Sequence, residues 1–184
     1  MINKDVESIL ISEEEIQTLV KEIAEKITND YAGRDSKLLL LGILKGSVVF
    51  MGDLMKNIDL PLEIDFMKVS SYGKGSKTSG KVNIVLDIHR TDLEDVDILI
   101  VEDIIDSGRT LSYLCEYLKL KGAKSVKTVT LLDKPSRREV EFTPDYHGME
   151  VPDYFVVGYG LDYNERYRAL PYVGILKPEV YTKH

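Results

Sequence analysis

The chain has 184 residues, 43% hydrophobic and 30% charged, which is enough to bury one sizeable core and ordinary for a globular protein. Its 24 Lys and Arg against 31 Asp and Glu give a net charge of -7, which disfavours a protein that coats nucleic acid. We therefore expect a single domain over residues 1–184 and no nucleic-acid partner.

Cysteine and histidine content argues against a disulfide framework and a zinc site. Cys115 is the single cysteine, and the 3 histidines lack the spacing of metal ligands. The longest apolar run, residues 38–44, is too short to span a bilayer, and residues 1–15 lack the apolar core of a signal peptide. The sequence predicts a cytoplasmic protein with no membrane partner.

The first predicted element is an amphipathic helix that starts after Ser12. Apolar residues recur there at spacings of three and four, namely Ile16, Leu19, Val20, Ile23 and Ile27. Ser12 and Glu15 have the spacing of a capping box, and Gly33 provides a stop signal. We predict a helix that ends near Gly33.

The next segments predict a strand, a helix and two more strands. Residues 37–44 form an apolar run typical of a strand buried on both faces, and residues 46–58 have helical length and an apolar stripe. Residues 60–70 alternate like a strand, and residues 81–88 are another strand candidate. Between them, residues 70–81 are rich in Gly, Ser and Lys, which predicts a mobile loop of the kind that often forms a lid.

Residues 97–134 show a strand, a loop, a helix that ends at Gly122 and a second strand. This βαβ pattern predicts a parallel sheet. Further short strands are expected at residues 154–160 and 172–176. The whole pattern predicts an α/β fold with an open, mainly parallel twisted sheet flanked by helices.

Three carboxylates stand together in residues 101–110, VEDIIDSGRT, directly after the apolar run of a predicted strand. Glu102, Asp103 and Asp106 repel one another and are costly to desolvate unless something positive binds nearby. In open parallel sheets, ligands bind beyond the carboxyl ends of the strands. We therefore expect these side chains to receive a cation or the hydroxyl groups of a ligand.

A phosphate cradle is expected in the same stretch. Gly108 permits close approach at the start of the following helix, and Ser107 and Thr110 add hydroxyl donors to the backbone N–H groups. A sugar phosphate with free hydroxyls, together with Mg²⁺, suits both the carboxylates and the cradle. The Walker and dinucleotide-binding patterns are both absent from the sequence.

The order EDIIDSGRT after an apolar strand resembles the phosphoribosyl diphosphate signature of the phosphoribosyltransferase family. GILKGS resembles the family's pyrophosphate loop, SSYG its mobile lid and LLDKP a purine-recognition segment. PDYFVVGYGLDYNERYR resembles the base-stacking and second-metal segment of hypoxanthine-guanine phosphoribosyltransferases. The matches run in the family's order over residues 38–178. The resemblance implies the type I fold, with a small hood built from the N- and C-terminal segments.

The implied reaction transfers the phosphoribosyl group from phosphoribosyl diphosphate to hypoxanthine or guanine, yielding IMP or GMP and pyrophosphate. By resemblance, the residues that bind phosphoribosyl diphosphate are Leu44, Lys45, Gly46, Ser71, Tyr72, Glu102, Asp103, Asp106, Ser107, Gly108, Arg109, Thr110 and Arg168. Those that bind the purine are Lys134, Phe155, Val156 and Asp162, and those that hold Mg²⁺ are Glu102, Asp103 and Asp162. The family also implies a homodimer or homotetramer.

Five of these residues have specific implied roles. Asp106 would face N7 of the purine as a general base, and Lys134 would donate to its 6-oxo group, which adenine lacks. Phe155 would stack on the base, while Ser71 and Tyr72 would close over the reacting centre. Tyr154 departs from the mammalian relatives, where a lysine is expected.

Other interpretations remain open from the sequence. Glu102 and Asp103 could form a solvated strand end, Lys134 a surface lysine and Phe155 a strand core residue. A regulator that kept the fold and controls nucleic-acid contacts would need a basic face, and the sequence offers none. Relatives that act on xanthine, adenine or uracil share the diphosphate motif. The sequence favours an enzyme acting on 6-oxopurines, with xanthine open as a secondary substrate.

Overall fold

The computed structural model describes residues 3–71 and 82–182 of the chain. Its strands are β1 Val6–Ile11, β2 Lys37–Ile43, β3 Leu62–Ser71, β4 Val82–Leu86, β5 Val96–Ile105, β6 Ser125–Asp133, β7 Tyr146–Glu150, β8 Val156–Val157 and β9 Val173–Leu176. Its helices are α1 Glu13–Tyr31, α2 Val48–Asn57, α3 Arg109–Leu120 and α4 Pro178–Tyr181, with a 3-10 turn at Pro135–Arg137.

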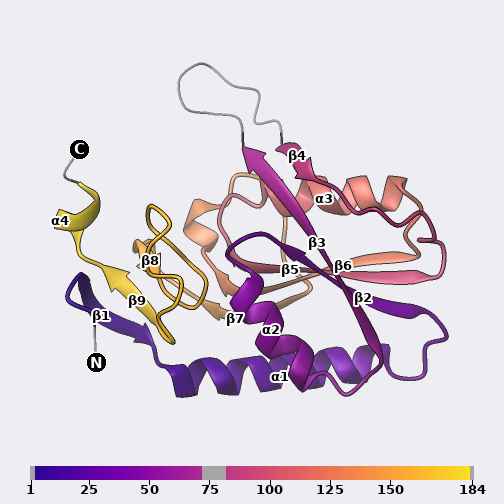
Figure 1. The fold of residues 1–184 in the computed structure, drawn as a ribbon, viewed down its shortest axis with the longest axis horizontal. Coiled ribbons are helices and arrows are strands. Elements are labelled where there is room, and N and C mark those ends of the chain that lie inside the picture. Colours follow the sequence, from indigo (N-terminus) through magenta and orange to yellow (C-terminus); the bar gives the residue numbers. More distant parts are fainter. Residues whose placement is uncertain (1–2, 72–81, 183–184) are drawn as a thin grey trace.

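The strands form two sheets, shown in Figure 1. The larger sheet has the order β4-β3-β2-β5-β6-β7, and its pairings are parallel except that between β3 and β4. The smaller sheet has the order β1-β9-β8 and is antiparallel. The predicted α/β fold with an open, mainly parallel sheet is confirmed.

Helix α1 begins as its capping box predicts. The Ser12 hydroxyl accepts a hydrogen bond from the Glu15 backbone N–H at 3.2 Å, and the Glu15 carboxylate accepts one from the Ser12 N–H at 2.8 Å. The helix ends at Tyr31, two residues before Gly33, whose φ of 74° is the left-handed conformation expected beyond a helix end. Both ends of the predicted helix are confirmed within a few residues.

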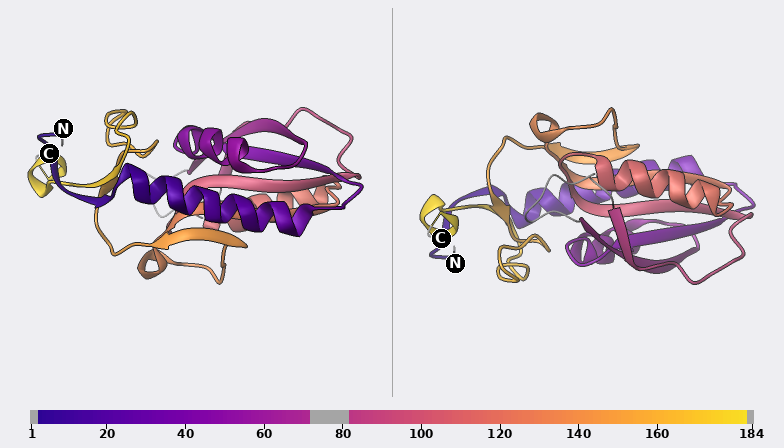
Figure 2. Two further views of the ribbon diagram at one scale, coloured as in Figure 1. Left: turned by 90° about the horizontal axis from the view of Figure 1, so that it is seen from below. Right: turned by 90° about the horizontal axis from the view of Figure 1, so that it is seen from above.

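Strand β2 is buried on both faces because helices cover both sides of the large sheet. Leu38 and Leu40 pack into a core with α1 and α2, whereas Leu39 and Leu41 pack into a second core with α3. In Figure 2, α1 is nearest the viewer from one side and α3 from the other. A strand with this environment has no polar face, which explains its continuous apolar run.

The hood implied by the family resemblance is the small sheet, which joins the two ends of the chain. Val6 of β1 pairs with Leu176 of β9, and both pack in a small apolar cluster with Val157 and Tyr172. Figure 1 shows this sheet and α4 at one end of the molecule, beside both chain ends. No helix in the described residues is long and apolar enough to cross a membrane.

The strand predicted over residues 154–160 is wrong in length, because β8 covers only Val156–Val157. The chain leaves the extended conformation at Gly158, Tyr159 and Gly160, whose φ angles are 99°, 51° and 98°. These positive angles lie outside the β region, so the strand cannot continue. The chain turns instead toward the large sheet, where Gly160 meets the loop after β2.

Candidate functional site

The candidate site lies at the carboxyl end of β5, where open parallel sheets bind their ligands. A cavity of about 350 Å³ is lined by residues 102–111 and Val82. The strand extends to Ile105, so Glu102 and Asp103 belong to its last residues instead of following it as predicted. Asp106 begins the loop that leads into α3, and its side chain is 55% exposed.

Glu102 and Asp103 are both partly buried, and their charges are poorly compensated. Among the described residues, Glu102 Oε2 is buried without a hydrogen-bond partner. Burial and the charges of Asp103 and Asp106 raise the pKa of Glu102 well above its usual value. Burial raises the pKa of Asp103 to about 6, although the Ile104 N–H and Arg168 act in the opposite direction. A bound cation or hydroxyl donors would stabilise the charged forms.

The predicted phosphate loop turns directly into α3 at Gly108. This residue has a φ of 80° and occupies the N-cap position of the helix. The Arg109 N–H donates to the Ser107 hydroxyl at 3.3 Å. Gly108 has no side chain to cap the N–H groups of Thr110 and Leu111, so these two remain available to an anion among the described residues. The Arg109 side chain pairs with Glu139 at 2.5 Å, so both the guanidinium and the backbone N–H of Arg109 already have partners.

The predicted pyrophosphate loop packs against the carboxylates. The Leu44–Lys45 peptide bond is cis, and Gly46 follows it. A Cβ atom on Gly46 would lie 1.8 Å from Asp103 Oδ2, and one on Gly160 would lie 2.1 Å from the Gly46 carbonyl oxygen. Three chain segments therefore meet at these two glycines, of which only Gly46 was predicted to belong to the site.

Asp162, predicted to hold Mg²⁺, and Arg168, predicted to bind phosphoribosyl diphosphate, lie together. Arg168 Nη2 is 3.1 Å from Asp162 Oδ1 and 3.4 Å from Glu165 Oε1, while its Nη1 donates to the Gly160 carbonyl at 2.8 Å. Lys45 Nζ pairs with the other Glu165 oxygen at 2.8 Å. Glu165 thus links Lys45 and Arg168, two residues predicted to bind phosphoribosyl diphosphate, although no role was predicted for Glu165 itself.

Lys134 and Asp106 come together although they are far apart in the chain. Lys134 is 9% exposed, and its Nζ donates to the Tyr154 carbonyl at 2.8 Å. The same nitrogen is 3.9 Å from Asp106 Oδ1. The residue predicted to read the purine 6-oxo group therefore stands beside the predicted general base, and it is not a surface lysine.

Phe155 is 37% exposed and belongs to an aromatic cluster of the hood. Its ring stacks on Tyr181 of α4 at a centroid distance of 4.9 Å and meets Tyr163 edge-on at 5.4 Å. Val156 is buried and pairs with β9 through Ile175. Stacking of Phe155 on a purine stays a prediction, as does reading of the base by the Val156 backbone.

Part of the predicted lid lies outside the described residues. Tyr72 is among the residues that the structure does not describe, and Ser71 is described only as the last residue of β3. The lid over residues 70–81 and the closing roles of these two residues therefore stay predictions.

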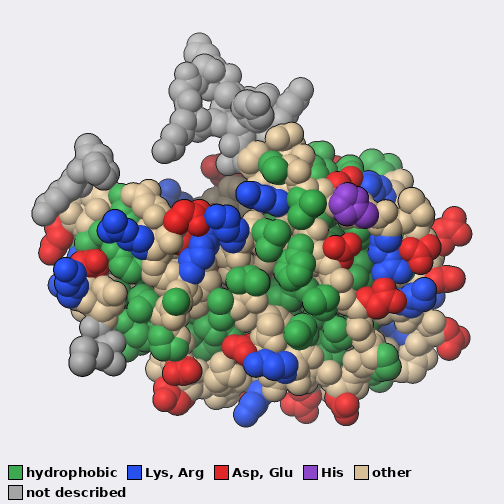
Figure 3. Space-filling view, viewed as in Figure 1, with side chains coloured by type: hydrophobic (Ala, Val, Ile, Leu, Met, Phe, Trp, Pro, Cys, Tyr) green, Lys and Arg blue, Asp and Glu red, His purple; other side chains and the backbone are tan. Residues whose placement is uncertain are grey.

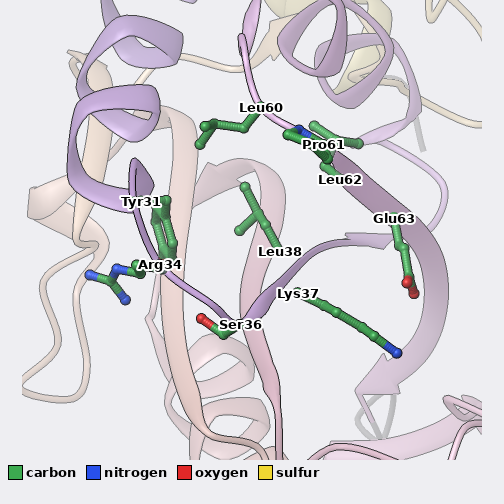
Figure 4. A pocket seen from close by; sticks show the side chains of 10 residues that line it. Tyr31, Arg34, Ser36, Lys37, Leu38, Leu60, Pro61, Leu62 and Glu63 are labelled. Carbon is green, nitrogen blue, oxygen red and sulfur yellow. The ribbon is translucent and has the colours of Figure 1, made fainter.

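A larger cavity, of about 420 Å³, lies at the opposite end of the strands, where β2 and β3 begin (Figure 4). Its apolar lining comes from Leu38, Leu60, Pro61 and Leu62. Its arginine and lysine already have partners, since Arg34 is 3.4 Å from Asp97 and Lys37 is 3.8 Å from Asp92. Size alone favours this cavity, but the poorly compensated carboxylates and the uncapped N–H groups at the start of α3 favour the one beside β5.

Comparison with known proteins identifies the family of the chain. A family model described as the phosphoribosyl transferase domain matches residues 7–164. The chain belongs to the phosphoribosyltransferase family. The implied family and its type I fold are confirmed.

Hypoxanthine phosphoribosyltransferases and a longer bifunctional protein are similar to this chain. It is 58% identical over 181 residues to the hypoxanthine-guanine phosphoribosyltransferase of Bacillus subtilis, covering 98% of this chain and 99% of that protein. It is 54% identical over 182 residues to the bifunctional protein TilS/HprT of Listeria monocytogenes, and it spans only 28% of that protein's length. A crystal structure of a Staphylococcus aureus hypoxanthine phosphoribosyltransferase superposes with a TM-score of 0.90 at 49% identity, covering 96% of this chain and 95% of that one.

Replacement of Gly46 by alanine is expected to disable the site, because its Cβ would collide with the Asp103 carboxylate. We expect kcat/KM to fall about 10²-fold, since misplacement by an ångström can cost that much. The control is Gly52→Ala in α2, where a Cβ meets nothing within 4 Å. Steady-state kinetics of both variants test this, and equal activity of the two would contradict the packing argument.

Replacement of Asp103 by asparagine is expected to stabilise the ligand-free protein while weakening substrate binding. Removing a charge that burial disfavours should raise the free energy of unfolding by about 1 kcal/mol. Urea denaturation of the variant and of Asp59→Asn, an exposed control, measures this. A loss of stability in Asp103→Asn alone would show that the carboxylate holds the fold together.

Proposed function

We propose that this chain transfers the 5-phosphoribosyl group from phosphoribosyl diphosphate to hypoxanthine or guanine, giving IMP or GMP and pyrophosphate in purine salvage. Its relatives from Bacillus subtilis and Lactococcus lactis, at 58% and 57% identity, are both hypoxanthine-guanine phosphoribosyltransferases. The structural observation that carries the proposal is the pairing of Lys134 with Asp106, 3.9 Å apart, at the start of the phosphate loop. This contact brings the proposed purine-binding lysine next to the proposed sugar-phosphate site.

In the proposed reaction, purine N9 forms a bond to C1 of the ribose as the bond from C1 to pyrophosphate breaks. The electron pair of the broken bond leaves with pyrophosphate. Glu102 and Asp103 accept hydrogen bonds from the ribose hydroxyls, and the start of α3 holds the 5′-phosphate through its backbone N–H groups. Fixing both ends of the sugar aligns C1 with the base and leaving group, which lowers the entropic part of the barrier.

Asp106 receives the purine proton in this scheme. Its carboxylate is exposed enough to reach N7 of a bound purine, where it accepts the proton that the base loses on becoming a nucleotide. The Lys134 ammonium donates to the 6-oxo group and stabilises the negative charge that develops there. Adenine carries an amino group at that position, so a 6-oxopurine is preferred.

The carboxylates of the site suit Mg²⁺, which prefers hard oxygen ligands. Glu102 has a buried oxygen without a partner among the described residues, and Asp103 lies beside it. In the described part of the chain, no group of three or more potential ligands gathers at one point. That pattern fits Mg²⁺ held by one or two carboxylates with water and substrate oxygens. Glu102 and Asp103 would hold one ion and Asp162 a second, and the metal would stabilise the charge on departing pyrophosphate.

We also propose that the protein acts as a homodimer or homotetramer. Exposed apolar side chains occur on neighbouring elements at one side of the sheet, at Val48 and Met55 of α2, Ile64 of β3, and Val85 and Leu86 of β4. Figure 3 shows hydrophobic side chains gathered on this face. A contiguous apolar face of a globular protein is typical of a subunit interface. Cytoplasmic location and a single domain over residues 1–184 stay predictions.

A panel of bases separates this function from its alternatives. Phosphoribosyl diphosphate and Mg²⁺ are supplied with hypoxanthine, guanine, xanthine, adenine or uracil, and nucleotide formation is measured. We expect fast turnover with hypoxanthine and guanine and none with adenine or uracil, because Lys134 requires a 6-oxo acceptor. Faster turnover with xanthine would assign the xanthine-preferring alternative. Binding of phosphoribosyl diphosphate without turnover of any base would support a ligand-binding regulator.

Asp106→Asn is expected to lower kcat by about 10²-fold, because an amide cannot accept the purine proton. The KM for phosphoribosyl diphosphate should stay close to that of the wild type, since the backbone of the phosphate loop is retained. Asp92→Asn, at an exposed position remote from the cavity, serves as the control. An unchanged kcat in Asp106→Asn would remove the general-base role.

A further inference from the structure

Arg138 lies behind the phosphate loop, and its guanidinium is bonded in three directions. Its Nε donates to the Asp106 carbonyl at 3.0 Å, its Nη1 to the Phe142 carbonyl, and its Nη2 to the Asp133 carboxylate. The side chain is only 17% exposed and its Asp133 partner 9% exposed. A guanidinium with these contacts is fixed in position, in contrast to most surface arginines.

The segment that follows Arg138 supports the same loop. The backbone N–H groups of Glu139 and Val140 both donate to the Ser107 carbonyl, at 3.0 and 3.3 Å. A Cβ atom on Gly108 would lie 3.0 Å from Arg138 Cδ, 3.2 Å from Val140 and 3.3 Å from Phe142. Residues 138–142 therefore form a support directly under the predicted 5′-phosphate loop.

The Asp133 contact connects this support to the purine side of the site. Asp133 is the last residue of β6, and Lys134 follows it. The Lys134 backbone N–H also donates to the Ile105 carbonyl at 2.9 Å, so β5 and β6 end in register. Through one guanidinium, the backbone of Asp106 is tied to the residue that precedes the purine-reading lysine.

We propose that Arg138 is a positioning residue of the phosphoribosyl transfer, which holds the Asp106 backbone and the 5′-phosphate loop at a fixed distance from Lys134. This inference rests on the proposed function and adds to it a residue that touches neither substrate. If the guanidinium is lost, the phosphate and purine sites can shift relative to each other. The reacting atoms then lose their alignment.

Neighbouring Arg137 provides a matched control. It pairs with Asp153 at 2.8 Å, but both side chains are largely exposed, at 60% and 45%. Its charge is felt at Asp106, but among the described residues its side chain has no hydrogen bond to the phosphate loop. Exposed pairs of this kind contribute little to stability. The two arginines thus differ in their contacts while sharing charge, size and chain location.

The test compares Arg138→Gln, Arg138→Lys and Asp133→Asn with Arg137→Gln. We expect Arg138→Gln to lower kcat/KM for phosphoribosyl diphosphate by about 10-fold to 10²-fold and to weaken IMP binding, measured by calorimetry well below the unfolding temperature. The kcat/KM of Arg138→Lys should lie between those of the wild type and Arg138→Gln, because one ammonium cannot donate to three separated acceptors at once. The kcat/KM of Arg137→Gln should stay within about 2-fold of the wild-type value.

The double variant Asp133→Asn, Arg138→Gln tests whether the two residues act together. If they do, its loss in kcat/KM, expressed as free energy, should be smaller than the sum of the losses of the two single variants.

A purely structural role predicts another result. In that case Arg138→Gln would lower the thermal unfolding temperature while its kinetic constants and IMP affinity matched those of Arg137→Gln, and the proposal would be wrong. If Arg138→Gln does not fold, the kinetic constants and IMP affinities of Arg138→Lys and Asp133→Asn are compared with those of Arg137→Gln instead. If the wild type itself makes no nucleotide from any base, the proposed function fails, independently of Arg138.

Discussion

The arrangement of the site depends on a repulsion at the end of β5. Glu102, Asp103 and Asp106 carry like charges within five residues, and burial makes the first two harder to ionise. Each surrounding feature reduces or exploits this repulsion. Arg168 acts on Asp103 through its charge, and the Lys134 ammonium lies 3.9 Å from Asp106. The remaining unfavourable energy is relieved by protonation of the carboxylates or by binding of a cation or hydroxyl groups, so the ionised carboxylates lower the stability of the free protein in favour of its ligand.

Much of the fold could be predicted because its central elements carry strong periodic signals. The apolar run of β2, the capping box at Ser12 and the stripe of α3 each reflect burial that one element experiences along its whole length. β1 and β7 were not predicted, since they are short and alternate weakly. β8 was overestimated because the positive φ of Tyr159 breaks a strand that its β-prone sequence would favour. Tertiary contacts, which local patterns do not encode, decide such segments.

For the site, too, features that lie close together in the sequence could be predicted, and contacts between distant segments could not. The carboxylates and the phosphate loop are consecutive in the sequence, so their joint chemistry can be inferred from residue order alone. The proximity of Lys134 to Asp106 came only from family resemblance, because parallel strands bring it about through a crossover helix. Gly160, Glu165 and Arg138 had no assigned role. Each acts through a contact distant in sequence: an approach to Gly46, an ion pair with Lys45, and a bond to the Asp106 carbonyl.

These contacts give Asp106 two different environments. Its backbone carbonyl is held by Arg138, and the next residue, Ser107, accepts two more backbone hydrogen bonds from the supporting segment. Its carboxylate remains 55% exposed and faces the Lys134 ammonium. The proposed general-base role needs this combination: the main chain must be fixed so that distances to the sugar phosphate do not vary, while the side chain stays open to receive a proton from the purine. Two different cations therefore act on Asp106: the Arg138 guanidinium fixes its carbonyl, and the Lys134 ammonium lies beside its exposed carboxylate.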